Sequence, residues 1–166
     1  LGQRTGVDLA GEKEGLVPDM DWSTRARGTT WYPGETISVA IGQGPLLVTP
    51  LQVATMMALV ANGGHSVSPH LDSKQDKRPT KPVGLSPEVL HDVRQALWAV
   101  VNERDGTGGR ARVDGLDIAG KTGTVQVVGQ RTWTDSNTLP PEQRDHAWFA
   151  SFAPLDDPRL VVVVFV

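Results

Sequence analysis

The sequence predicts an α+β fold, an antiparallel sheet flanked by helices, and two kinds of pattern support this prediction. Residues 50–61 and 86–102 repeat apolar side chains at the spacing of an amphipathic helix. Residues 116–128, 146–153 and 160–166 are rich in valine, threonine and aromatic side chains, which is typical of strands. Successive strands joined by short connections should pair antiparallel.

The first part of the chain predicts little regular structure. Residues 1–35 contain many glycines and turn formers and show no apolar period. Residues 36–41 are expected to form a short extended segment. Gly42-Gln43-Gly44 follows, and we interpret it as a tight turn with a structural role.

Start and stop residues define the two helices. In the first, Thr49 is a good N-cap, Pro50 suits the first helical position and Gln52 completes a capping box. The second should begin at Ser86-Pro87 and fray near Asn102. The buried stripe expected for the second helix consists of Val89, Leu90, Val93, Leu97, Val100 and Val101.

Composition excludes several classes of site. The chain has no cysteine, so disulfides and thiolate metal sites are excluded. His65, His70 and His91 have no ligand-like spacing with carboxylates, and we predict neither a metal nor a cofactor. The formal net charge of −3 does not indicate a nucleic-acid partner, which usually calls for a clustered basic surface.

The two ends predict a piece of a longer protein. The chain opens on Leu1-Gly2-Gln3 without a methionine and stops on an all-apolar run, residues 161–166, that is typical of a buried strand. A natural terminus is usually polar and frayed, so we expect that the chain is cut at both ends.

Residues 115–124, Gly-Leu-Asp-Ile-Ala-Gly-Lys-Thr-Gly-Thr, fit two motifs at once. They match the phosphate-loop pattern G-x-x-x-x-G-K-[ST], and they contain the K-T-G triplet of penicillin-recognising enzymes. A phosphate loop needs a helix after its lysine, whereas Gly123 and the valines and threonine that follow predict a strand. On an edge strand, Lys121 offers a cation, the threonine hydroxyls can donate to a carboxylate, and Gly123 lets a ligand approach the backbone.

Six further stretches accompany the triplet, and together they resemble the C-terminal part of the transpeptidase domain of class B penicillin-binding proteins. The similarity is greatest to the elongation-specific group, penicillin-binding protein 2, and it runs nearly end to end in the family's order. The matching stretches are LGQRTGVDL (1–9), WYPGE (31–35), IGQG (41–44), VTPLQ (48–52), ANGG (61–64), GKTGT (120–124) and HAWF (146–149).

The resemblance implies a partial penicillin-binding/serine β-lactamase-like fold and a set of site residues. It implies that Lys121 belongs to the active-site hydrogen-bond network, and that the side chains of Thr122 and Thr124 meet the substrate carboxylate. It also implies that the Thr124 amide supplies half of an oxyanion hole. We therefore predict Lys121 and Thr124 as catalytic, and Thr122, Gly123 and Gln126 as substrate-binding; Gln126 either contacts substrate or is an outward polar residue.

The family's other motifs are missing from the sequence. No serine begins an S-x-x-K, S-x-N or S-D-N motif. We expect residues 1–166 to be an incomplete, C-terminal portion of a transpeptidase domain, with the nucleophile upstream of Leu1. These residues alone should not be acylated.

The function implied by the resemblance is a peptidoglycan D,D-transpeptidase that β-lactams inhibit. Its partners would be stem peptides ending in D-Ala-D-Ala, β-lactams and cell-wall elongation proteins, with no nucleic acid. It would lie on the periplasmic face of the cytoplasmic membrane, held by an N-terminal helix absent from this chain. The alternatives are a D,D-carboxypeptidase or β-lactamase, a non-catalytic penicillin sensor and, most distantly, a nucleotide enzyme.

Overall fold

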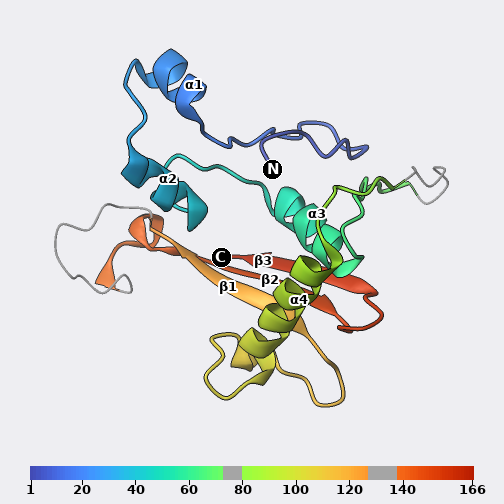
Figure 1. Ribbon diagram of the computed structural model, residues 1–166. Coiled ribbons are helices and arrows are strands. Elements are labelled where there is room, and N and C mark those ends of the chain that lie inside the picture. Colours follow the sequence, from blue (N-terminus) through green and yellow to red (C-terminus); the bar gives the residue numbers. More distant parts are fainter. Residues whose placement is uncertain (73–79, 127–137) are drawn as a thin grey trace.

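The computed structural model describes residues 1–72, 80–126 and 138–166. Short π-helical and 3-10 turns occupy Ser23–Arg27, Gly109–Ala111 and Pro141–Gln143. The helices and strands, shown in Figure 1, are α1 (Met20–Trp22), α2 (Pro33–Ala40), α3 (Pro50–Ala61), α4 (Pro87–Asn102), β1 (Ala119–Val125), β2 (His146–Ala153) and β3 (Leu160–Phe165).

The three strands form one antiparallel sheet in the order β1-β2-β3, so the predicted α+β class is confirmed. The register places Lys121 opposite Ala150 and Thr124 opposite Ala147. The observed β1 is shorter than the predicted strand 116–128: it begins at Ala119 and ends at Val125, and residues 127 and 128 lie outside the described residues.

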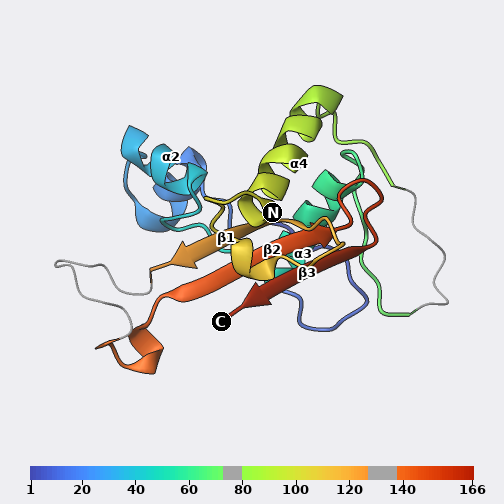
Figure 2. The same ribbon diagram turned by 90° about the horizontal axis from the view of Figure 1, so that it is seen from below.

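Both long helices pack on the sheet (Figures 1 and 2). Helix α3 lies over β2 and β3, while α4 contacts β1 and α3. The buried core joins α3 to the sheet through Met57, Ala61, Ala119, Ala150 and Phe152. Among the described residues β1 pairs only with β2, so its other edge is not paired with a strand.

The capping box predicted for α3 is confirmed. The Thr49 hydroxyl accepts the N–H of Gln52, and the Gln52 side chain accepts the N–H of Thr49 in return. Gln52 is almost fully buried, and its amide nitrogen is satisfied by donating to the carbonyls of Gln3 and Glu14, at 2.7 Å each. One side chain thus starts the helix and ties the N-terminal segment to it.

Helix α4 has the predicted bounds, but its predicted buried stripe is partly wrong. Leu90 and Val101 are buried, whereas Val89 and Val93 are exposed. The inward face also includes Arg94, which lies over the Phe152 ring, and Trp98, which packs against the core and donates to Asp117. These two long side chains combine apolar contact area with a polar tip, a property that an apolar period does not detect.

The extended segment predicted for residues 36–41 is also wrong, because α2 occupies this part of the chain. Its start carries strong local helix signals. Pro33 is the first helical residue, and the Glu35 carboxylate accepts the N–H of Tyr32 at 2.9 Å and pairs with Arg27 at 2.6 Å. These interactions outweigh the strand preference of the β-branched residues that follow.

The same contacts give α2 a defined pH dependence. Hydrogen bonding from Tyr32 N–H, followed by Arg27, holds the pKa of Glu35 below its ordinary 4.5. A carboxyl with a depressed folded-state pKa contributes stability above its unfolded pKa and loses that contribution as pH falls through the folded pKa. The start of α2 should therefore stay ordered at neutral pH and loosen only below pH 4.5.

The NMR shift of the Tyr32 amide, followed against pH, measures this transition. Its midpoint should lie below 4.5, and Glu35→Gln, which keeps an acceptor but cannot titrate, should remove it. A midpoint at or above the ordinary value would contradict the expectation.

None of the helices in the described ranges has the length and apolarity needed to cross a bilayer.

Candidate functional site

The site predicted from the K-T-G triplet lies on β1, an edge strand of the described sheet. Ala147 exchanges both of its backbone hydrogen bonds with Val166, so its N–H and C=O face away from β1. Ala147 lies opposite Thr124, which makes this a non-hydrogen-bonded pair. The N–H and C=O of Thr124 therefore point outward from the sheet, and by alternation so do those of Thr122 and Gly120.

The predicted side chains surround this outward edge. Lys121, Gly123 and Thr124 are exposed, Thr122 is half-buried, and Gln126 is exposed just beyond the last residue of the strand. The Lys121 ammonium donates to the outward carbonyl of Thr122 at 2.7 Å. Within the described part of the chain it forms no ion pair, so its charge is available to a substrate carboxylate.

Thr107, which the sequence analysis did not single out, orients the Thr122 hydroxyl. The two Oγ1 atoms lie 2.9 Å apart. Gly106 and Gly108 bring this loop back onto the end of α4: Gly108 N–H donates to the Val100 carbonyl, and a Cβ at Gly106 would lie 2.3 Å from that same oxygen. In the sequence, the signal for this contact between Thr107 and Thr122 is the Gly-Thr-Gly run at residues 106–108.

The two glycines of the motif have different surroundings. A Cβ at Gly120 would lie 2.8 Å from Phe149 Cζ and 2.9 Å from Ser151 Cβ, which is closer than packed atoms allow. A Cβ at Gly123 would meet Trp148 Cβ at 3.5 Å, an ordinary contact. Packing within the chain therefore requires glycine at 120 but not at 123.

Gln43, from the turn after α2, reaches the same edge. Its side-chain Nε2 donates to the Thr124 carbonyl at 3.2 Å, although the two residues are 81 positions apart. The sequence analysis assigned this turn a structural role and did not connect it to the K-T-G strand.

A cavity of about 420 Å³ lies beside the end of β1, next to Gln43. Its walls are mostly apolar, and Gln126 and His146 add polar groups at the strand ends. The His146 ring lies 4.8 Å from the Phe165 ring, which makes it part of the wall. Whether Gln126 contacts substrate stays a prediction. The apolar walls include Leu46, Leu47, Val125, Trp148 and Phe165.

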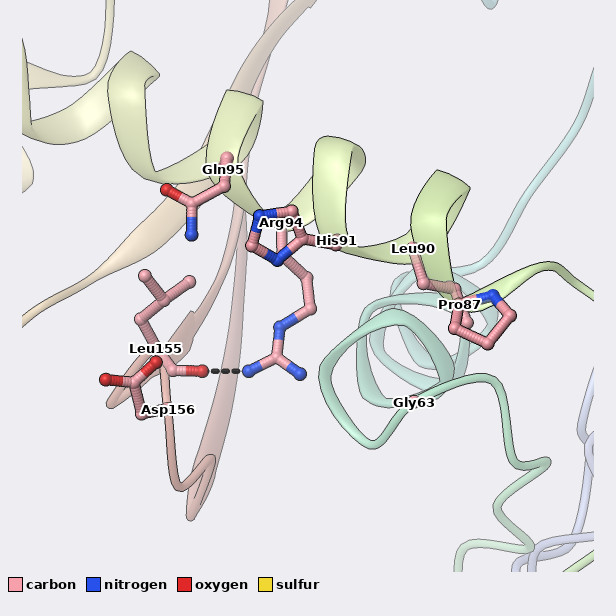
Figure 3. A pocket seen from close by; sticks show the side chains of 8 residues that line it. All are labelled: Gly63, Pro87, Leu90, His91, Arg94, Gln95, Leu155 and Asp156. Atoms are coloured by element: carbon pink, nitrogen blue, oxygen red, sulfur yellow. Dashed lines mark hydrogen bonds between the residues drawn. The ribbon is translucent and has the colours of Figure 1, made fainter.

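A second cavity, of about 340 Å³, lies between α4 and the turn that joins β2 to β3 (Figure 3). Arg94 reaches across it and donates to the Leu155 carbonyl, so this side chain fixes the turn to the helix. Leu155 follows the Ala153 end of β2, whereas Thr124 pairs near its His146 end. The second cavity thus lies at the other end of the sheet from the predicted site.

No group of three His, Asp or Glu residues that could hold a metal ion comes together in the ranges 1–72, 80–126 and 138–166. The edge of β1 presents the Lys121 ammonium, threonine hydroxyls and outward backbone amides. This set suits recognition of an extended peptide with a carboxylate.

Comparison with known proteins gives consistent matches. The family model described as the penicillin binding protein transpeptidase domain matches residues 1–166. The peptidoglycan D,D-transpeptidase MrdA of Acinetobacter baumannii is 41% identical over 99% of this chain and 26% of its own length.

Solved structures agree with this result. In the complex of penicillin-binding protein PBP2 and MreC from Helicobacter pylori, one chain matches with a TM-score of 0.87 and 34% identity, over 99% of this chain and 29% of that one. Pseudomonas aeruginosa PBP2 in complex with WCK 5153 matches with a TM-score of 0.78 and 36% identity, over 99% of this chain and 36% of that one. The chain thus spans between a quarter and two fifths of the length of these three proteins.

Proposed function

Because this chain belongs to the penicillin-binding protein transpeptidase family, with the PBP2/MrdA-type proteins among its relatives, we propose that the whole protein is a serine-type peptidoglycan D,D-transpeptidase. The observation that carries this proposal is the outward edge of β1. It presents the Lys121 ammonium, the Thr122 and Thr124 hydroxyls and the Thr124 N–H on one short strand. Residues 1–166 would be the C-terminal portion of the domain, and the serine would come from a segment that precedes them.

In the proposed reaction, a donor stem peptide adds to β1 as an extra strand. Its terminal carboxylate meets Lys121 and the hydroxyls of Thr122 and Thr124. The serine oxygen attacks the carbonyl of the penultimate D-alanine, and the terminal D-alanine leaves as the peptide bond breaks. The amine of a neighbouring stem peptide then attacks the acyl-enzyme, which forms the cross-link and releases the serine.

The orientation of Thr124 supports its predicted part in this reaction. Negative charge develops on the carbonyl oxygen as the tetrahedral intermediate forms, and a fixed N–H aimed at that oxygen lowers the barrier. The Thr124 N–H points away from β2, on the side where the peptide would add. A β-lactam would occupy the same edge and be attacked in the same way.

The family also bears on partners and location. A Helicobacter pylori PBP2 forms a complex with MreC, and we extend this to propose that cell-wall elongation proteins bind the whole protein here. Its location would be the periplasmic face of the cytoplasmic membrane, held by an N-terminal anchor.

Intact mass spectrometry after incubation with a reactive penicillin tests the proposal. The whole protein should gain one penicillin per molecule, and the adduct should persist. A β-lactamase, in contrast, would hydrolyse the adduct quickly. The 166-residue chain alone, treated identically, should gain nothing. A stoichiometric adduct on this chain would place the nucleophile within residues 1–166, and a whole protein that is never acylated would refute the proposed activity.

A further inference from the structure

The Gln43 side chain holds an outward carbonyl of the strand that is proposed to bind peptide. Its Nε2 donates to the Thr124 oxygen at 3.2 Å; Gln43 is half-buried and Thr124 is exposed. Val125, which follows, pairs with His146 of β2, so Thr124 carries the last outward-facing carbonyl of β1. Gln43 therefore stands at the end of the free edge.

The turn that carries Gln43 has a fixed backbone conformation. Gly42 and Gly44 have φ values of 79° and 73°, the left-handed conformation that favours glycine. The N–H groups of Gly42 and Gln43 donate to Val39 and Ser38, which fixes the turn on the end of α2. A Cβ at Gly42 would meet nothing within 4 Å and one at Gly44 would meet only Ser38 at 3.7 Å, so these glycines serve the backbone conformation rather than packing.

A free strand edge leaves the register of an added peptide open. Outward groups recur every second residue, at Gly120, Thr122 and Thr124. A peptide could therefore pair in registers that differ by two residues, which move its scissile bond by about 7 Å along the strand. Reaction needs the carbonyl within a fraction of that distance of the nucleophile. A fixed group at one end of the edge would exclude the other registers of the peptide.

We propose that Gln43 is a positioning residue that ends the peptide-binding edge of β1 at Thr124 and thereby sets the register of the donor peptide. This inference rests on the proposed transpeptidase function. Because a carbonyl oxygen has two lone pairs, Gln43 can keep its bond while a peptide N–H shares the same acceptor. Gln43 thus blocks the edge beyond Thr124 but leaves the Thr124 carbonyl able to accept an N–H from the donor peptide.

The test compares substrates of different length in the whole protein. Gln43→Ala should lower kcat/KM for a stem pentapeptide by about 10-fold, the equivalent of one hydrogen bond. It should lower the rate of acylation by benzylpenicillin much less, since this small ligand has little strand register to set. The ratio of the two rate constants, measured on one sample, does not depend on how much of the variant is folded.

Two further variants sharpen the result. Gln95→Ala removes an exposed glutamine that lines the cavity beside α4, and it should leave the ratio unchanged. Gln43→Glu cannot donate while ionised, so at neutral pH it should behave like Gln43→Ala. Relative to Gln43→Ala it should recover below about pH 5, as the carboxyl gains a proton.

The outcomes separate this inference from the proposed function. A wild-type protein that penicillin does not acylate would refute the function. A wild-type protein that is acylated, with a Gln43→Ala variant whose ratio is unchanged or shifted toward the pentapeptide, would overturn the inference alone. An unchanged ratio with equal losses for both substrates would indicate a merely structural role for Gln43.

Discussion

Replacing Lys121 with alanine should lower the rate of penicillin acylation of the whole protein by about 10²-fold, the equivalent of losing a hydrogen bond to a charged group. The fold should not suffer, because the Lys121 side chain is exposed and its ammonium contacts only the Thr122 carbonyl among the interactions of the described residues. The loss should fall on acylation because the proposed substrate carboxylate would lose its cation. The rate is measured by mass spectrometry or with a fluorescent penicillin.

Two other variants control for general effects. Lys13→Ala removes an exposed lysine from the N-terminal segment and should acylate at the wild-type rate. Lys121→Arg keeps the charge but replaces a compact ammonium with a planar fork, so it should recover only part of the activity. If Lys121→Ala reacted at the wild-type rate, Lys121 would be an exposed strand lysine without a part in catalysis.

The two glycines of the motif should separate stability from activity. Gly120→Ala should destabilise the whole protein by roughly 1 to 3 kcal/mol, the usual cost of overpacking, because its Cβ would collide with Phe149 and Ser151. Gly123→Ala should unfold at the wild-type temperature, since its Cβ meets only an ordinary contact at 3.5 Å. It should nevertheless lower acylation by on the order of 10²-fold, because a methyl group would displace the peptide from the strand.

Thermal unfolding and acylation rates, measured on the same preparations, check this pair. Each glycine variant is the control for the other, since both make the same chemical change on the same strand. A Gly123→Ala protein with full activity would mean that no ligand approaches the strand at this residue. A Gly120→Ala protein with an unchanged unfolding temperature would contradict the close packing of Phe149 on β1.

Much of the fold could be predicted from the sequence because its signals are local. The Thr49–Gln52 capping box and the β-branched strands act over a few residues, and the structure confirms them. The predictions failed where two local signals conflict or where contacts decide. In α2 the interactions of Glu35 outweigh β-branched residues, and in α4 the side chain of Arg94 rather than Val93 covers the sheet.

The predicted site residues came from one stretch of sequence, and this is why part of the site was missed. Residues 121–126 lie together because they are consecutive, whereas Thr107 and Gln43 reach them through tertiary contacts. The outward direction of the Thr124 amide depends on the pairing of Ala147 with Val166, the residue that follows β3. Residue types reveal neither the contacts of Thr107 and Gln43 nor the direction of the Thr124 amide, because strand register and loops far away in the chain determine them. The catalytic and binding roles of these residues remain predictions.

The bond between Gln43 and Thr124 has a consequence for the order in which the chain folds. It joins positions 81 apart, whereas the helices and the β2–β3 hairpin form from near neighbours. Contacts between distant positions must first overcome the entropy of closing a long loop. The helices and the hairpin should therefore exist before the turn reaches the strand, so the edge of β1 would be completed late in folding. A newly made chain would then contain its helices and the β2–β3 hairpin before it could hold a peptide in a single register.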